Sequence, residues 1–416
     1  MKNLKMLAIA GLSSLVLLSA CKTNKNNTMD TKSGTDAENT APVNITENNN
    51  LFAFDLYKMI SVKPENMFYS PYSISAALAM TYTGARNNTE IQMSSVMHFP
   101  ASNEAFHNQY NTVLKDINAL NDGSTMNIYT ANSIWAQKNF KFKEDFIGVL
   151  KNSYNSSLNT VDFIKETEAS RILINKWVED QTKEKIKDLI QPGLIDYLTR
   201  MVLVNAIYFK ANWEIAFDEK QTQKMDFYST ENSPVTCDFM FAEKEFKFYE
   251  QGEDLKAIEI PYSKGNMSML VIMSKDKNGF GLVNKQMSLD LYNTINEGLV
   301  SKKVKLWLPK FKTTSEFELS EVLKQMGMKE AFSDNADFSG MTGKKDLKIS
   351  KVIHKAFVEV NEAGTEAAAA TAVVMRVKSM PVNPPEFRAD HPFMFIIKEN
   401  KNNSILFAGN IFDPTK

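Results

Sequence analysis

The stretch VNEAGTEAAAATAVVMRVKSMP, residues 360–381, is the most informative part of this 416-residue chain. Its run of alanines favours a helix by intrinsic propensity. However, the alternating segment KVIHKAFVEV (residues 351–360) precedes it and predicts a strand, and the proline-rich PVNPPEF (residues 381–387) follows it. The stretch therefore lies between a strand and a turn, where helix propensity alone does not decide its structure.

At a period of two, the stretch separates into two faces. One face carries only uncharged side chains: Thr365, Ala367, Ala369, Thr371, Val373 and Met375. The other face carries Glu366 and Arg376. Because no proline interrupts residues 365–380, the stretch could enter a sheet as a strand with its uncharged face toward a core. A flexible alanine-rich surface loop explains the same residues, and the pattern alone leaves both interpretations open.

The first 21 residues have the features of an export signal. Lys2 and Lys5 precede an apolar stretch at residues 6–18, and the sequence Leu-Ser-Ala-Cys then ends at Cys21. Small residues directly before a cysteine resemble the lipobox of bacterial lipoproteins, in which cleavage leaves the cysteine as a diacylated first residue. An ordinary secretory signal with a chance cysteine is the alternative. The apolar stretch is shorter than the roughly 20 residues that a transmembrane helix needs.

Residues 22–48 are rich in Asn, Thr, Lys, Ser and Asp and have few apolar side chains, which predicts a flexible tether. The predicted organisation is a lipoprotein signal peptide (1–20), a tether (21–48) and one folded domain (49–416). Two or more acyl chains on Cys21 would give stable membrane anchoring, so we expect an exported lipoprotein at the outer membrane or cell surface. Cys237 would then be the only free thiol, and the fold could not rely on a disulfide.

Composition favours one large domain and excludes several classes of partner. The chain is 43% hydrophobic, and no linker rich in Pro, Gly or Ser interrupts it after about residue 50. Its 48 basic and 49 acidic residues are well mixed, whereas nucleic acid requires a concentrated basic face. Four histidines and two cysteines are too few and too scattered for a metal cluster. We expect no metal, no other cofactor and no nucleic acid partner.

Hydrophobic spacing predicts mainly helices in the first half of the chain and mainly strands in the second. Helices are expected at residues 50–62, 73–83, 172–186 and 316–326, and strands at residues 126–135, 201–209, 255–260, 268–273 and 304–308. Residues 396–397 and 405–408 should form a closing hairpin around Asn402-Asn403. This order predicts an α+β fold in which several sheets share one core.

Two of these helices carry more specific expectations. The helix at residues 73–83 (SISAALAMTYT) is made of small residues and should be buried on all sides. The helix at residues 172–186 is amphipathic, with Ile172, Trp177 and Ile186 among its apolar positions.

None of the four histidines lies in a recognisable catalytic motif. The sequence around His98, His107, His354 and His391 contains no nucleophile motif, and the chain has no G-x-S-x-G, no phosphate-binding glycine loop and no H-E-x-x-H. His354 lies in the alternating segment 351–360, which favours a buried, hydrogen-bonded histidine. We therefore predict that the chain is not an enzyme, with an unfamiliar hydrolase as the alternative.

Several motifs resemble those of serpins, the serine protease inhibitor superfamily. NEAGTEAAAATA, residues 361–372, closely resembles the hinge of inhibitory serpins, whose pattern is E-x-G-T-E-A followed by small residues. Six further landmarks occur in the family's order: NMFYSPYSISAALAMTYTGARNNTEIQM (66–93), LVNAIYFKANWEIAF (203–217), VKLWLPKF (304–311), FSGMTG (338–343), ISKVIHKAFVEV (349–360) and ADHPFMFII (389–397). The resemblance extends from about residue 50 to the C-terminus. With its lipobox, the chain is similar to the bacterial lipoprotein branch of serpins, the miropin-like branch.

The resemblance implies a serpin fold, with three β-sheets, about nine helices and an exposed reactive loop that stays outside the sheet until it is cleaved. Glu362 begins the hinge, and the part that enters the sheet first comprises Gly364, Thr365, Glu366, Ala367, Ala368, Ala369 and Ala370. Trp213 matches the tryptophan of the breach, the place where insertion begins. The resemblance also implies a polar cluster beneath the opening of the sheet, the shutter, formed by Ser70, Ser73, Asn175, Asn205 and His354.

Family spacing places the reactive bond sixteen positions after Glu362, at Lys378–Ser379. The segment from this bond to Pro392-Phe393 is about three residues longer than in familiar serpins, so Arg376 and Met380 remain neighbouring candidates.

The resemblance implies a monomeric suicide inhibitor of serine endopeptidases that traps the protease as a covalent acyl-enzyme by loop insertion. Trypsin-like proteases are the first expected partners because of Lys378, followed by elastase-like or subtilisin-like enzymes and by cysteine endopeptidases. A non-inhibitory serpin with a carrier or storage role is the alternative. The small residues of the hinge favour inhibition.

Overall fold

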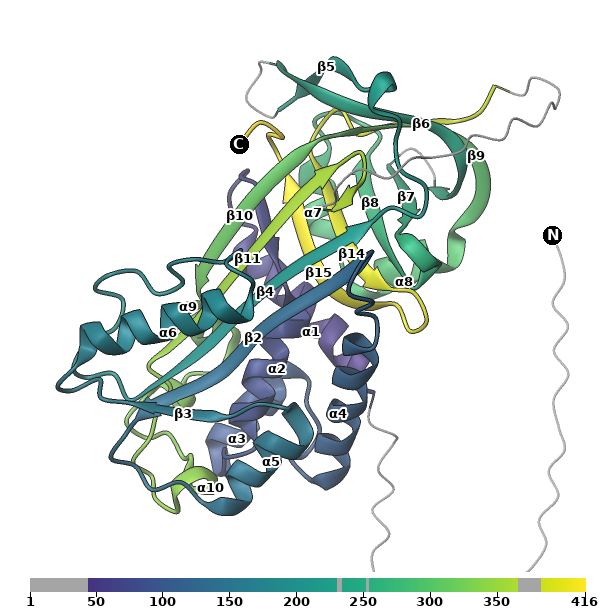
Figure 1. Cartoon of the computed structure of the whole chain (residues 1–416). Coiled ribbons are helices and arrows are strands. Elements are labelled where there is room, and N and C mark those ends of the chain that lie inside the picture. The colour runs from purple at the N-terminus through teal and green to yellow at the C-terminus, as the bar shows by residue number, and fades with distance from the viewer. Residues whose placement is uncertain (1–43, 230–233, 252–253, 366–382) are drawn as a thin grey trace, which may run out of the picture. The chain divides into compact units, whose positions relative to one another are not determined.

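The computed structural model describes residues 44–229, 234–251, 254–365 and 383–416 (Figure 1). Cys21, hinge residues 366–370 and the Lys378–Ser379 bond lie outside the described residues. Within the described part of the chain, no helix has the length and apolar composition needed to cross a bilayer.

The described residues contain ten α-helices, six of them in the first half of the chain. They are α1 (Ile45–Ile60), α2 (Pro71–Tyr82), α3 (Asn87–Met97), α4 (Glu104–Asn118), α5 (Glu144–Tyr154), α6 (Thr167–Gln181), α7 (Phe280–Gln286), α8 (Leu289–Gly298), α9 (Ser320–Met326) and α10 (Ser339–Thr342). Three short 3-10 helices are η1 (Glu219–Gln221), η2 (Ser263–Gly265) and η3 (Glu330–Phe332).

A six-stranded sheet contains the candidate site. Its order is β10 (Phe311–Glu318), β11 (Lys351–Asn361), β12 (Gly364–Thr365), β4 (Met201–Asn212), β2 (Met126–Gln137) and β3 (Leu158–Val161). Successive side chains of a strand point to opposite faces, and β4 is apolar on both. Val202 and Val204 pack with α6 residues on one face, while Leu203 packs with α1 and α2 residues on the other. Figure 1 shows α6 lying across the sheet.

The remaining strands form a second, nine-stranded sheet. Its main path is β1 (Met67–Tyr69), β15 (Ser404–Ile411), β14 (Phe393–Glu399), β8 (Met267–Ser274), β7 (Leu255–Pro261), β6 (Pro234–Gln251), β9 (Val300–Pro309) and β13 (Glu386–Arg388), and β5 (Gln223–Tyr228) pairs with β6. The 18-residue β6 pairs with β5, β9 and β7 in turn along its length. Through β6, two of the three expected sheets are hydrogen-bonded into one continuous sheet, so the described residues form two sheets. The predicted α+β fold is confirmed.

Several predicted elements lie where the sequence placed them. All twelve residues of α2 are buried, which confirms the expectation for residues 73–83. The five predicted strands fall within β2, β4, β7, β8 and β9, and β14 and β15 form the closing hairpin.

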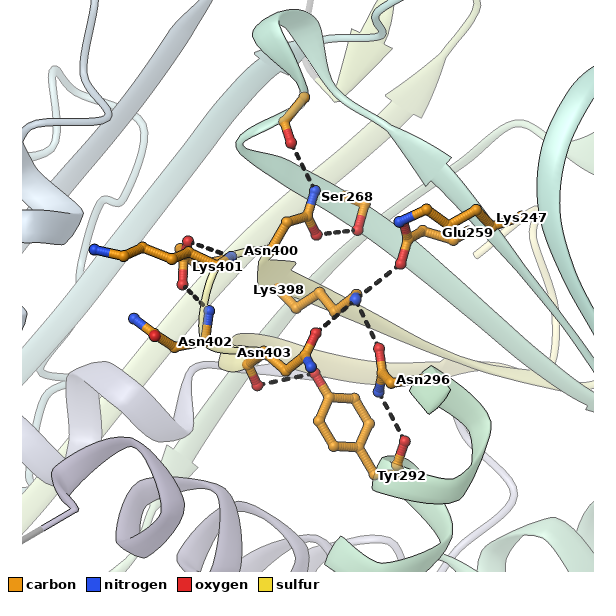
Figure 2. Close-up of polar contacts among 12 residues, drawn as sticks. Lys247, Glu259, Ser268, Tyr292, Asn296, Lys398, Asn400, Lys401, Asn402 and Asn403 are labelled. Atoms are coloured by element: carbon orange, nitrogen blue, oxygen red, sulfur yellow. Dashed lines mark hydrogen bonds and ion pairs between the residues drawn. The ribbon is translucent and has the colours of Figure 1, made fainter. Parts of the chain in front are cut away.

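The turn of this hairpin is fixed by a buried ion pair (Figure 2). The side chains of Lys398 and Glu259 are each 4% exposed, and Lys398 Nζ lies 2.8 Å from Glu259 Oε2. Lys398 also donates to Asn296 Oδ1 at 2.6 Å and to Asn403 Oδ1 at 2.9 Å, and Lys247 pairs with the other Glu259 oxygen at 2.8 Å. These partners compensate for the desolvation of the buried charges.

Three predicted helices have different limits in the structure. Asn44 caps α1 by accepting a hydrogen bond from the Glu47 amide, so the helix begins at Ile45 and residues 45–48 belong to the folded unit rather than to the tether. The predicted helix 316–326 was wrong in its first turn. Residues Glu316–Glu318 continue β10, because they pair with β11, and α9 begins at Ser320.

The predicted helix 172–186 is displaced toward the N-terminus. α6 begins at Thr167 and ends at Gln181, because Lys183 and Glu184 adopt positive φ angles of 54° and 59° that a right-handed helix cannot continue. Ile172 is 55% exposed, and the buried stripe runs through Ile174 and Val178 instead.

Candidate functional site

The two central strands of the six-stranded sheet pair directly along only part of their length. β4 and β11 are parallel neighbours from the pair Val202–Lys351 to the pair Tyr208–Phe357. We call this paired region the β4–β11 seam. Beyond it the strands separate, and β12 lies between them (Figure 1).

The first two residues of the entering segment already form this intervening strand. Gly364 pairs with Asn212 and Asn361, and Thr365 pairs with Ala211 and Val360. The expectation that the whole hinge lies outside the sheet is therefore wrong for these two residues. The physical reason is the tight turn after Asn361, whose Oδ1 accepts the Ala363 amide at 3.1 Å and directs the chain back between the strands. Thr365 faces inward, as its place in the period-two pattern predicted, and is fully buried.

Gly364 occupies a position that excludes a side chain. Its φ of 155° is rarely adopted by other residues, and a Cβ there would lie 2.1 Å from the Ala211 carbonyl oxygen and 2.6 Å from Asn212 Cα. The glycine therefore allows the hinge backbone to approach β4 closely.

Trp213 holds the hinge from the end of β4. Its Nε1 donates to the Asn361 carbonyl at 2.9 Å, and its amide donates to the Ala363 carbonyl at 3.0 Å. Its ring stacks on Tyr262, with centroids 4.6 Å apart and planes 6° from parallel. Tyr262 Oη in turn lies 2.7 Å from Thr365 Oγ1. The structure thus brings Trp213 and the start of the hinge together.

Glu362 is fixed by partners from two other segments. Thr222 donates to Glu362 Oε1 at 2.8 Å, Lys310 lies 3.0 Å from Oε2, and the Phe217 amide donates to the Glu362 carbonyl at 2.9 Å. Burial alone would raise the pKa of Glu362, but the hydrogen bonds from Lys310 and Thr222 outweigh burial and hold the pKa below its usual value. The carboxylate is therefore charged when it anchors the start of the hinge.

Beneath the seam, His354 connects β11 to β4 and to the start of α2. The Ser70 amide donates to His354 Nε2 at 3.1 Å, and His354 Nδ1 donates to Asn205 Oδ1. The ring is neutral in this arrangement, because Nε2 accepts a hydrogen bond. Burial lowers the pKa of His354 to about 3. His354 is the buried, hydrogen-bonded histidine that the strand pattern predicted.

The polar cluster includes Asn132, which the sequence analysis did not indicate. It does not include Asn175, which the sequence analysis had assigned to it. Asn132 Oδ1 accepts from Ser73 Oγ at 2.9 Å and from Asn205 Nδ2 at 2.6 Å. Asn175 instead bonds the backbone of Ile190 through both its amide atoms, at 2.8 and 3.0 Å. The shutter in this chain is therefore Ser70, Ser73, Asn132, Asn205 and His354.

Tyr262 and Asn132 are among the residues that the sequence analysis missed, together with Thr222 and Lys310, which hold Glu362. Tyr262 follows a predicted strand in an ordinary polar turn, and Asn132 lies within a predicted strand where a polar residue is unremarkable. Only tertiary structure reveals their roles. Over the described ranges, no group of three His, Cys, Asp or Glu side chains is placed to hold a metal ion.

The six-stranded sheet holds the start of the hinge, Gly364 and Thr365, between its two central strands. Comparisons with known proteins give the family of this fold. The model of the family "Serpin (serine protease inhibitor)" matches residues 47–414. The leukocyte elastase inhibitor of Xenopus laevis is 39% identical over 371 residues, covering 87% of this chain and 97% of that protein.

Solved structures of similar proteins include two with a TM-score of 0.80. Uncleaved ovalbumin is 32% identical, and the match covers 89% of this chain and all of that one. Human thyroxine-binding globulin is 30% identical, with 89% and 99% covered. The chain belongs to the serpin family of serine protease inhibitors.

Proposed function

We propose that this chain is an inhibitory serpin, a suicide inhibitor that is cleaved in its reactive loop and retains the protease as an acyl-enzyme while the loop enters the six-stranded sheet. The observation that carries this proposal is β12. Gly364 and Thr365 already occupy the gap between β4 and β11, so insertion has a defined starting point and register.

The first chemical step would take place at the Lys378–Ser379 bond. The serine hydroxyl of the protease attacks the Lys378 carbonyl and loses its proton to the catalytic base of the protease. The peptide bond breaks, the Lys378 acyl group forms an ester with the protease, and the Ser379 amine leaves with a proton as a new N-terminus. A Lys side chain suits a specificity pocket that contains a carboxylate, which is why trypsin-like enzymes are the first candidates.

Continuing the observed β12 register assigns partners to the rest of the entering segment. Three residues beyond the Thr365 pairs, Ala368 would lie between Tyr208 and Phe357, the last pair of the seam. Three residues further, Thr371 would lie between Asn205 and His354 and would replace their mutual hydrogen bond. Small side chains suit both places, because the strand must separate residues that are now in direct contact.

Insertion would replace one set of interstrand backbone hydrogen bonds with two sets, and it would move the attached protease along the length of the sheet. Separating β4 from β11 breaks one set of backbone hydrogen bonds, and the new strand forms sets on both of its sides, each bond contributing on the order of 1 kcal/mol. Residues 364–378 extended at about 3.3 Å per residue span roughly 50 Å. The uncleaved form would therefore be kinetically trapped until cleavage frees the loop.

A carrier or storage role is the second candidate, because thyroxine-binding globulin has a similar structure. The hinge sequence Gly-Thr-Glu-Ala-Ala-Ala-Ala argues for inhibition instead, because it has no proline and its inward-facing residues Thr365, Ala367 and Ala369 are small and uncharged. Incubating the soluble domain with trypsin and running a denaturing gel decides between them. An inhibitor gives a protease complex that survives denaturation, whereas a carrier is left intact or is only cleaved.

We further propose that the chain is a miropin-like bacterial lipoprotein, anchored through Cys21 at the outer membrane or cell surface. The supporting observation is Leu-Ser-Ala-Cys after a short apolar stretch. Changing Cys21 to Ala should abolish incorporation of labelled fatty acid by cells that express the protein. Continued labelling of the variant would contradict the proposed anchor.

A further inference from the structure

Two large apolar side chains are exposed at the end of the six-stranded sheet that lies opposite the hinge. β4 begins there at Met201, and in the turn before it Tyr197 is 62% exposed and Leu198 is 56% exposed. Figure 1 shows β2, β3 and β4 meeting at this end of the sheet. A single exposed apolar residue is ordinary, whereas two adjacent ones at a defined place suggest a contact surface.

The turn that carries these side chains is held firmly on the sheet. Within it, the Leu198 amide donates to Asp196 Oδ1 at 2.9 Å. The Arg200 carbonyl accepts from the amide of Gln137, the last residue of β2, at 2.9 Å. The Arg200 amide donates to the Ser350 hydroxyl, just before β11, at 3.0 Å. The turn therefore presents its apolar pair at a fixed position beside the starts of β4 and β11.

The register of β12 brings the reactive bond to the same position after insertion. Continuing this register, Met375 would lie between Met201 and Ser350, where β4 and β11 begin. At about 3.3 Å per residue, the next three residues extend roughly 10 Å beyond that point and bring Lys378 level with Leu198. Because the protease is attached to Lys378 through its catalytic serine, it would come to rest against this end of the sheet.

A protease that stays attached as an acyl-enzyme offers an apolar surface to this pair. An intact serine protease hydrolyses its own acyl-enzyme, so a lasting ester requires that the catalytic geometry of the protease be disturbed. Disturbing the packing around the active site of the protease exposes apolar side chains that its native fold buries. Contact with Tyr197 and Leu198 would remove part of this surface from water, which favours association.

We propose that Tyr197 and Leu198 form a docking surface for the distorted acyl-protease, and that this contact prolongs the life of the trapped complex. The proposal rests on the proposed inhibitory function. A surface that binds the distorted protease more tightly than the ordered one shifts the protease toward its distorted form. Only the ordered form hydrolyses the Lys378 ester efficiently, a step in which water restores the serine hydroxyl of the protease and leaves a carboxylate on Lys378.

The rate at which the purified complex releases active trypsin tests the docking surface. The variant Tyr197→Ser/Leu198→Ser removes both apolar side chains and should release trypsin at least threefold faster than the wild type. Tyr197→Phe keeps the apolar ring and should release trypsin at the wild-type rate. The matched control Val62→Ser/Leu282→Ser removes two exposed apolar side chains, one after α1 and one on α7, and should also behave as the wild type does.

Amide hydrogen exchange tests the contact directly. In the wild-type complex, exchange in a peptide that covers residues 194–201 should be at least severalfold slower than in cleaved inhibitor that has been separated from trypsin. Circular dichroism and the melting temperature establish that each variant is folded. If the Tyr197→Ser/Leu198→Ser variant does not fold, Leu198→Ser alone replaces it and carries the same expectation.

The two proposals fail in different ways. If the wild type forms no denaturant-stable complex with trypsin, the inhibitory function fails and the docking surface fails with it. If the complex forms, the docking surface alone is overturned by equal release rates from the wild type and the folded serine variant. Unchanged exchange at residues 194–201 in the complex also overturns it.

Discussion

The hydroxyl groups of Tyr262 and Thr365 lie 2.7 Å apart at the point where β4 and β11 separate. Both side chains are fully buried, and Tyr262 also stacks on Trp213. One tyrosine therefore links the tryptophan at the end of β4 to the second residue of β12. This contact holds the second residue of β12 in its place between β4 and β11.

Tyr262→Phe should loosen the hinge without removing the aromatic stack. The variant loses one buried hydrogen bond, which should lower the free energy of unfolding by about 1 kcal/mol. Amide hydrogen exchange should become at least several-fold faster in a peptide that covers residues 361–365. The matched control is Tyr292→Phe, which loses a hydrogen bond of 3.0 Å to the Asn403 carbonyl in the closing hairpin (Figure 2). The role given to Tyr262 would be contradicted if both variants lost similar stability and neither showed faster amide hydrogen exchange in the peptide that covers residues 361–365.

Lys378→Ala should abolish inhibition of trypsin and spare part of any inhibition of elastase. The alanine cannot form the charge-assisted contact with a carboxylate in the trypsin pocket, whereas elastase accepts small side chains. In the wild type, mass analysis of the C-terminal peptide released by trypsin should find Ser379 at its start. A peptide that begins at Val377 or Pro381 would instead move the reactive bond to Arg376 or Met380.

Stability should depend on pH through His354. Burial lowers the pKa of His354 to about 3 in the folded state, against an ordinary value of 6.5. The unfolded chain therefore binds the proton first, so the contribution of the neutral ring is complete above about pH 6.5 and is lost as the pH falls toward 3. Urea unfolding should show wild type more stable than His354→Gln at pH 7.5, with a difference that shrinks by pH 4.5. A difference that is constant over this range would show that His354 does not titrate as its burial requires.

The sequence predicted the parts of the site that depend on local pattern. Alternation along residues 351–360 placed His354 on the buried face of a strand, and the period-two pattern gave the inward direction of Thr365. The position of Thr365 could not be predicted, because it depends on how far β4 and β11 separate, which is a tertiary property. Tyr262 and Asn132 were missed for the same reason. Asn175 was misassigned to the shutter because a motif gives the identity of a residue and not the direction of its side chain.

The buried position of Thr365 also determines where the insertion mechanism can be tested. Thr365→Arg would force a charge against Tyr262 in the uncleaved protein and disturb the fold itself. Ala369 is the better position, because it shares the inward face of Thr365 but lies four residues further along the entering segment. Continuing the β12 register would place Ala369 between Ile207 and Ala356, which are both fully buried.

Ala369→Arg should convert the inhibitor into a substrate. Insertion would place an unpaired charge in the apolar core, at a cost of several kcal/mol, so the acyl-enzyme would hydrolyse before the loop entered. The matched control is Glu366→Arg, whose side chain would face the opposite side of the sheet between the half-buried Lys210 and Glu359 and should impair inhibition much less. Both variants should still be cleaved at Lys378–Ser379, and cleavage should raise the melting temperature far less in Ala369→Arg than in wild type. A denaturant-stable trypsin complex formed by Ala369→Arg at the wild-type stoichiometry would refute insertion in this register.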